Sequence, residues 1–317
     1  MSDLEQISTG GVHVLRPREV PLGGPRAMTT VRRTLPQRDR STVGAWCFAD
    51  HYGPDDVART GGMRVPPHPH TGLQTVSWLF AGEIEHRDSA GHHALVRAGE
   101  LNLMTAGRGI SHSEVSTPGT ALLHGVQLWV ALPDAARATA PRFEHHAPDD
   151  VTGPGWRARV FLGEALGRGS PVATHTPLLG AEVELAPGAR LELDVDPRFE
   201  HGVLVDAGPV TVLGPAPDVL QPGELGHLDP GRRSLTLAAP PAAPARLLLL
   251  GGTPFTEPIL MWWNFVGRTH EEIVGFRADW EAGRFALPVD DPLPPLPAPA
   301  LPTSRLRPRA HPVRRTS

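Results

Sequence analysis

The sequence contains no lysine, a single cysteine and no long hydrophobic run, and each absence excludes a class of protein. Without lysine there is no amine for Schiff-base catalysis or an internal pyridoxal-phosphate linkage, and a phosphate-binding P-loop is excluded as well. Cys47 has no partner for an intrachain disulfide and cannot build a thiolate zinc site. The longest apolar stretch, residues 246–251, is far shorter than the ~20 residues of a membrane-spanning helix.

The first residues of the chain and its net charge limit the cellular location and the partners that we expect. The first residues are acidic and lack the apolar core of a secretory signal, so together with the lone cysteine they lead us to expect a cytoplasmic protein. The formal net charge is −4 and the isoelectric point is near 6.5. We therefore expect neither a membrane nor a directly bound nucleic acid as a partner.

Glycine and proline are abundant, at 34 and 36 residues, and they separate many short strand-like runs. This pattern predicts an all-β fold of the sandwich or barrel type with few short helices. One C-terminal helix is expected. Thr269 is suited to cap its start, Ile273, Phe276 and Trp280 recur at helical spacing, and Gly283 would end it.

Two segments of the chain resemble each other and indicate a duplicated unit. Residues 82–101 and residues 208–225 both begin at a turn glycine and end in a second Gly-Glu-Leu turn before the next strand. Such a repeat predicts two similar barrels. We expect an N-terminal barrel at 11–135, a second at 136–287, and a disordered tail rich in proline and arginine at 288–317.

The chemistry of the chain is concentrated in two short motifs of the first barrel. His68-Pro69-His70 places two imidazoles two residues apart, and His112-Ser113-Glu114 does the same with an imidazole and a carboxylate. Side chains two residues apart on a strand share a face, so two such strands facing one interior would bring four ligands together. Three neutral nitrogens and one carboxylate suit iron, zinc, manganese, nickel, cobalt or copper as a divalent ion.

Histidine pairs also arise by chance, because the chain contains 16 histidines. We expect His86, His92–His93 and His145–His146 to be exposed loop residues without such a role. When the two repeats are aligned, Asp194, Asp196, Thr236 and Ala238 fall at the four ligand positions. The second barrel is therefore expected to lack the metal site.

At this point the chain resembles the pirin family of bicupins over residues 11–287. The stretches that carry the resemblance are Val65–Val76, Gly82–Ser89, Met104–Glu114, Leu123–Pro133 and Glu257–Val266. The resemblance implies two cupin β-barrels of the jelly-roll type, packed face to face, with one metal, most often Fe(II), in the N-terminal barrel. The family's ligand positions correspond to His68, His70, His112 and Glu114, and all four are intact.

The resemblance implies two alternative functions. Some family members resemble quercetin 2,3-dioxygenases, which open a flavonol or related polyphenol with O2. In that case Glu114 is the expected general base, because it is the only carboxylate of the set. Other relatives are metal-dependent, redox-sensing regulators that bind a protein partner without turnover. The fold does not decide between an enzyme and a regulator.

Overall fold

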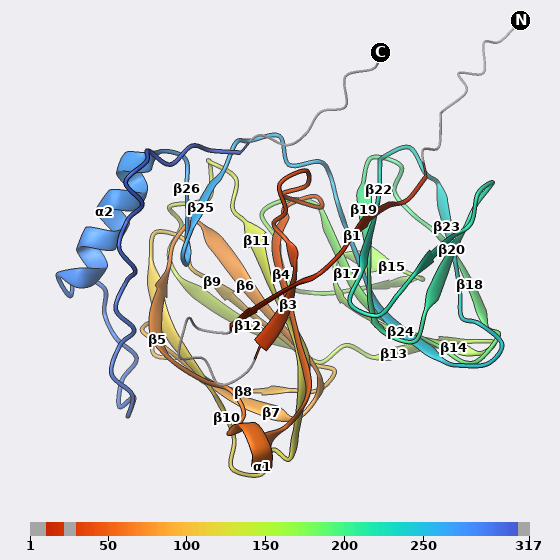
Figure 1. Cartoon of the computed structure of the whole chain (residues 1–317), viewed down its shortest axis with the longest axis horizontal. Helices are drawn as coiled ribbons and strands as arrows, with labels where there is room; N and C mark the ends of the chain where they lie inside the picture. Colours follow the sequence, from red (N-terminus) through yellow and green to blue (C-terminus); the bar gives the residue numbers. More distant parts are fainter. Residues whose placement is uncertain (1–10, 22–29, 310–317) are drawn as a thin grey trace, which may run out of the picture. The chain divides into compact units, whose positions relative to one another are not determined.

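The computed structural model describes residues 11–21 and 30–309, and this part of the chain is mostly β-strand (Figure 1). The expected all-β class is confirmed. The chain divides into two compact units, which we call the first and the second barrel. In the part of the chain that the structure describes, no helix is long and apolar enough to cross a membrane.

The first barrel contains the described residues of 18–42, 46–147 and 256–309. A seven-stranded antiparallel sheet and a four-stranded antiparallel sheet form it. The strands of the larger sheet are, in spatial order, β12 (Arg142–His146), β9 (Leu101–Thr105), β6 (Leu73–Ala81), β11 (Leu122–Ala131), β4 (Trp46–Asp56), β3 (Thr30–Leu35) and β2 (Arg18–Pro21). Those of the smaller sheet are β5 (Arg64–His70), β10 (Ile110–Ser116), β7 (Glu83–Asp88) and β8 (His93–Arg97).

The second barrel repeats this plan with the described residues of 1–17, 43–45 and 148–255. Its larger sheet runs β1 (His13–Leu15), β22 (Leu225–Leu228), β19 (Glu200–Ala207), β24 (Ala245–Gly252), β17 (Leu178–Leu185), β14 (Trp156–Leu162) and β13 (Asp150–Gly153). Its smaller sheet runs β18 (Arg190–Asp194), β23 (Ser234–Ala238), β20 (Val210–Leu213) and β21 (Asp218–Leu220).

The turn glycines of the repeat occupy equivalent places in the two barrels. Gly82 has φ +90° and Gly208 has φ +65°, which only glycine adopts readily. A Cβ at Gly82 would lie 2.5 Å from the Leu122 carbonyl oxygen, and one at Gly208 would lie 2.1 Å from that of Pro244. The repeat read from the sequence thus reflects the same tight backbone approach in both barrels.

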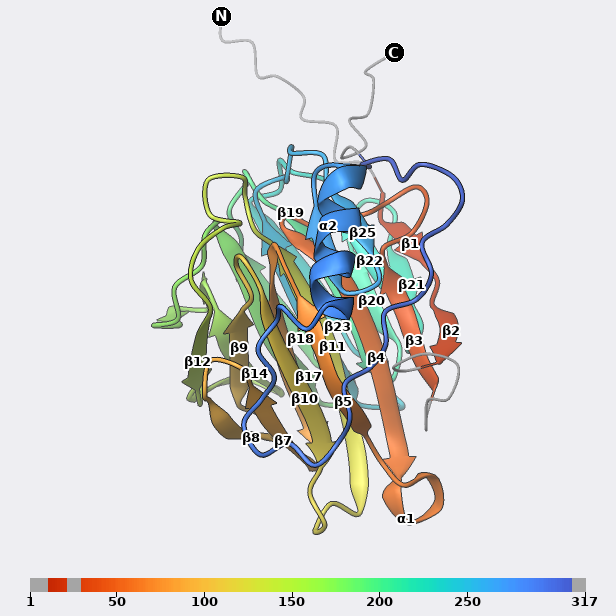
Figure 2. The same ribbon diagram turned by 90° about the vertical axis from the view of Figure 1, so that its left-hand side faces the viewer.

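The C-terminal helix forms as predicted. Helix α2 (His270–Glu281) is capped by the Thr269 hydroxyl, which accepts a hydrogen bond from the Glu272 backbone N–H at 3.2 Å. Ile273 and Trp280 are its buried residues, and Gly283 follows it with φ +67°. The helix lies beside the smaller sheet of the first barrel, as Figure 2 shows.

The C-terminal segment corrects two expectations about the domains. Residues 256–287, assigned from the sequence to the second barrel, belong to the first. Residues 288–309, expected to be disordered, run along the first barrel: the Leu296 N–H donates to the Pro67 carbonyl at 2.8 Å, and the Trp280 indole N–H donates to the Leu296 carbonyl at 2.8 Å. Scattered apolar residues of the segment pack on the aromatic cluster around α2. The overall composition of the segment, rich in proline and arginine, did not predict this packing. Residues 310–317 lie outside the described chain.

Candidate metal centre

Three neighbouring strands of the smaller sheet carry the candidate residues on one face. In the pairing of β10 with β5, His112 lies opposite His68. In the pairing of β10 with β7, His112 lies opposite Asp88 and Glu114 lies opposite His86. Because side chains alternate along a strand, His70 shares the face of His68 and all these groups point to the barrel interior.

Strand β5 brings its histidines to this face in spite of three prolines. Proline lacks a backbone N–H and is tolerated at sheet edges and bulges. β5 is the edge strand of its sheet, and its register with β10 shifts between the His112 and Glu114 positions, next to Pro66 and Pro67. The Leu296 N–H donates a hydrogen bond to the Pro67 carbonyl, so the C-terminal segment covers the outer edge of β5.

The structure brings His68, His70 and His112 together. Their candidate ligand atoms all lie within 4.8 Å of one another, and the Nε2 atoms of His70 and His112 are 3.0 Å apart. His70 and His112 are each 1% exposed, whereas His68 is 7% exposed. All three side chains are therefore buried, and His68 is the least buried of them.

The second ring nitrogen of each histidine faces a hydrogen-bond partner. The Nδ1–H of His68 donates to the Pro66 carbonyl at 2.9 Å, and that of His70 donates to the Asn264 carbonyl at 3.0 Å. The Nδ1 of His112 lies 3.3 Å from the Nδ1 of His86. A ring with its proton on Nδ1 presents an unprotonated Nε2, which is the form that binds a metal. The three rings therefore fit a shared metal ion.

Burial keeps these imidazoles neutral. It lowers the pKa of His68 to about 4, with the charge of nearby His86 acting in the same direction. Burial, followed by the neighbouring histidines, lowers the pKa values of His70 and His112 well below the usual range. Since protons compete with metals for histidine nitrogen, low pKa values favour metal binding at neutral pH.

Glu114 lies beside this set but groups with different partners. Its carboxylate lies within 4.8 Å of the ligand atoms of His86 and His112, and it accepts a hydrogen bond from the Ser77 hydroxyl at 3.2 Å. Burial raises its pKa, while His86 and Ser77 oppose the rise. Of the four predicted ligands, the three histidines form one cluster, and Glu114 joins it through His112.

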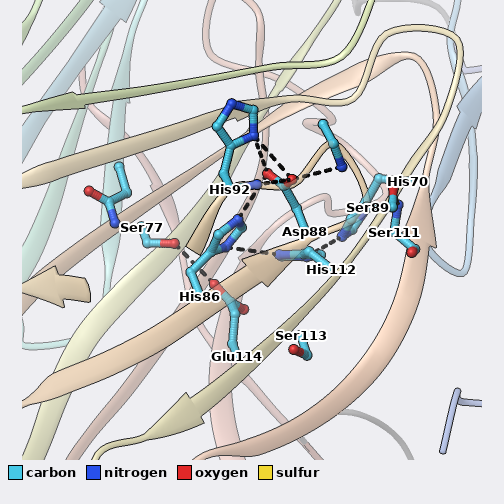
Figure 3. Close-up of polar contacts among 12 residues, drawn as sticks. His70, Ser77, His86, Asp88, Ser89, His92, Ser111, His112, Ser113 and Glu114 are labelled. Atoms are coloured by element: carbon cyan, nitrogen blue, oxygen red, sulfur yellow. Dashed lines mark hydrogen bonds and ion pairs between the residues drawn. The ribbon is translucent and has the colours of Figure 1, made fainter. Parts of the chain in front are cut away.

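His86 is where the sequence interpretation was wrong. It was expected in an exposed loop, yet it lies on β7 and is 3% exposed (Figure 3). Its Nε2 is 3.4 Å from the Asp88 carboxylate, which also accepts from His92 Nδ1 at 3.0 Å. Burial raises the pKa of Asp88, but hydrogen bonds from His86 and the His92 backbone outweigh it and lower the value. The alternation of Ile84, His86 and Asp88 was the signal that could have revealed an inward-facing strand.

The interior wall next to Glu114 adds polar groups that the sequence did not single out. The Ser77 hydroxyl lies 3.0 Å from the Gln127 side-chain oxygen, so Gln127, Ser77 and Glu114 form a continuous line. The hydroxyl of Tyr52, the only tyrosine, is buried without a partner among the described residues. Burial, reinforced by the Glu114 charge, raises the pKa of Tyr52 well above its usual range.

Comparisons with known proteins agree with this arrangement. The chain is 44% identical over 259 residues to a Pseudomonas aeruginosa protein provisionally named a quercetin 2,3-dioxygenase, covering 80% of this chain and 79% of that protein. It is 37% identical to a pirin-like protein of Caulobacter vibrioides, covering 81% of this chain and 90% of the relative. The crystal structure of a quercetin 2,3-dioxygenase from Acinetobacter baumannii superposes with a TM-score of 0.86 at 37% identity, covering 93% of this chain and 97% of that one.

Family profiles match both barrels. The profile described as Pirin matches residues 28–130, and the one described as Pirin C-terminal cupin domain matches residues 180–286. With two barrels built on one plan, a cluster of buried histidines in the first, and close relatives across most of its length, this chain belongs to the pirin family of bicupins.

Proposed function

We propose that this protein is an iron-dependent dioxygenase that opens the ring of a flavonol or related polyphenol with O2. The observation that carries the proposal is the convergence of His68, His70 and His112, each with its Nδ1 engaged by another group. The names of the Pseudomonas and Acinetobacter relatives support this reaction class.

His68, His70 and His112 would hold the metal, with Glu114 as the fourth ligand. A bound divalent ion supplies Lewis acidity, which lowers the pKa of a substrate hydroxyl, and a site at which O2 chemistry takes place. The protein itself must orient the flavonol, remove its proton and keep the site largely dry. Glu114 and His68 are buried but are the least buried of the four, at 6% and 7% exposed, so we expect a substrate to approach from their side.

Glu114 would act as the general base toward the 3-hydroxyl of the flavonol. Burial raises the pKa of this carboxyl, which makes the carboxylate a stronger proton acceptor. Ser77 holds one carboxylate oxygen, and Gln127 in turn lies against Ser77. This line of contacts fixes the direction of the carboxylate. The overall reaction joins both oxygen atoms of O2 to the substrate and releases carbon monoxide.

Metal analysis followed by an aerobic flavonol assay tests this proposal. We expect about one iron per chain, loss of flavonol absorbance that requires O2, and a turnover at least about 100-fold lower in Glu114→Gln at matched metal content. Glu85→Gln is the matched control, because Glu85 lies on the same sheet but is bound to Arg87 on the outer face. Retention of iron without turnover of any flavonol would overturn the enzymatic proposal. Capture of a protein partner that depends on iron oxidation state would then identify a regulator.

A further inference from the structure

A positively charged pocket lies on the surface of the first barrel, separate from the histidine cluster. Its volume is about 230 Å³, and none of the candidate metal ligands lines it. Four arginines line it: Arg18 of β2, Arg38 of the β3–β4 loop, and Arg307 and Arg309 of the C-terminal segment. The segment first read as a disordered basic tail thus supplies half of its arginines.

The charge of this pocket is only partly compensated within the described chain, because the charge of Arg18 also acts on the buried Asp50 carboxylate. No carboxylate lines it, and no ion pair is formed by any of its four arginines among the residues that the structure describes. Two other arginines of the same C-terminal region are paired: Arg305 contacts Glu271, and Arg284 contacts Asp279. Four arginines around one pocket create a local positive potential, although the protein as a whole has a net charge of −4.

Backbone contacts hold two of these side chains in place. An Arg309 guanidinium N–H donates to the Gln37 carbonyl at 3.3 Å, and one from Arg18 donates to the Pro36 carbonyl at 3.4 Å. The main chain of Arg309 is fixed by an antiparallel bridge to Ile259, with N–H···O distances of 2.8 and 3.2 Å. Each guanidinium has five N–H donors, so most remain available to a ligand.

We propose that this pocket binds a small phosphorylated anion, such as a diphosphate or the phosphate end of a phosphate ester. Arginine forks match phosphate oxygens in paired hydrogen bonds, and four positive charges suit a group that carries more than one negative charge. The volume is below the ~300 Å³ of typical sites for drug-sized ligands, which favours a compact anion. Ile259 and Met261 give one wall an apolar surface on which the rest of an ester can lie.

Calorimetric titration with pyrophosphate, free of divalent cations, tests the proposal on the full-length protein as purified. We expect one saturable site whose affinity falls as salt rises. The double variant Arg38→Ala, Arg307→Ala should lose pyrophosphate affinity by about 100-fold, because each lost charge-assisted bond costs about tenfold or more. Arg305→Ala is the control: it removes an exposed arginine two residues away that is already paired with Glu271.

The design separates this pocket from the metal centre and from non-specific attraction. Pyrophosphate held by the metal would bind the double variant unchanged, and that result would overturn the proposal. So would the absence of saturable binding at millimolar pyrophosphate, or an equal loss in Arg305→Ala. Citrate serves as a multivalent anion without phosphorus, and binding as tight as that of pyrophosphate would refute the phosphate assignment. Inorganic phosphate and glycerol 3-phosphate then distinguish a free anion from an ester, both of which fall within the proposal.

Discussion

Replacing His86 by phenylalanine tests how His112 is oriented in the candidate metal centre. If His112 binds the metal through Nε2, its Nδ1 carries the proton and needs an acceptor. The only group that the structure shows there, among the described residues, is Nδ1 of His86 at 3.3 Å. His86 can accept only with its own proton on Nε2, which lies 3.4 Å from the Asp88 carboxylate. Phenylalanine keeps a ring beside Phe143 but removes the acceptor.

The expected size of the effect follows from the burial of the site. In His86→Phe the His112 N–H would remain buried and unpaired in the metal-bound state, which costs about 1–3 kcal/mol. The metal-free protein avoids this cost by moving the proton to the other nitrogen. The dissociation constant for the metal should therefore rise about 10- to 100-fold, the range seen when groups that orient metal ligands are removed.

Competition with a chromophoric chelator measures this constant directly, without any activity assay. His92→Ala is the matched control, because His92 also binds Asp88 but is partly exposed and does not contact His112. A His86→Phe protein with unchanged metal affinity would refute the orienting role. Complete loss of metal at saturating concentration would show instead that His86 is itself a ligand, consistent with its position near His112 and Glu114.

Three further predictions concern stability. His201 of the second barrel is fully buried with neither ring nitrogen bonded among the described residues, and burial lowers its pKa to about 4. Since the unfolded chain then binds the proton more readily, stability falls as pH drops from about 6.5 toward 4. Relative to His201→Leu, wild type should lose about 2 kcal/mol of unfolding free energy between pH 7 and pH 5 in denaturant titrations, and parallel pH profiles would contradict this. Tyr52→Phe removes a hydroxyl without a described partner and should raise the unfolding free energy by about 1 kcal/mol, whereas a loss would reveal a hidden partner. A chain ending at Pro288 loses the acceptor of the Trp280 indole and the cover of β5, so it should melt several degrees lower, and an unchanged melting temperature would refute the packing role of the segment.

The sequence predicted the parts of the site that depend on local spacing. His68 and His70 are two residues apart, as are His112 and Glu114. This spacing predicted that each pair lies on one face of a strand, and the structure shows the same arrangement. The capped helix near Thr269 was equally local. These features follow from backbone periodicity and capping chemistry alone.

What the sequence did not predict depends on contacts between distant residues. The acceptor for His70 is the backbone carbonyl of Asn264, 194 positions away, and a carbonyl leaves no trace in residue types. The role of His86 follows from the register of β7 with β10, which a single strand does not encode. Residues 256–309 likewise belong to the first barrel because the chain returns to it after completing the second barrel, and local sequence does not show this return.

The prolines of β5 have a consequence for how the molecule meets other molecules. An exposed edge strand normally offers alternating donors and acceptors on which a foreign strand can grow. Pro66, Pro67 and Pro69 remove donors from this edge, so an incoming chain finds few N–H groups with which to pair. If the C-terminal segment were to detach, the strand bearing His68 and His70 would be uncovered without becoming a template for intermolecular β-sheet. The edge strand that carries His68 and His70 is thereby protected from such pairing in two ways, by the covering C-terminal segment and by its own prolines.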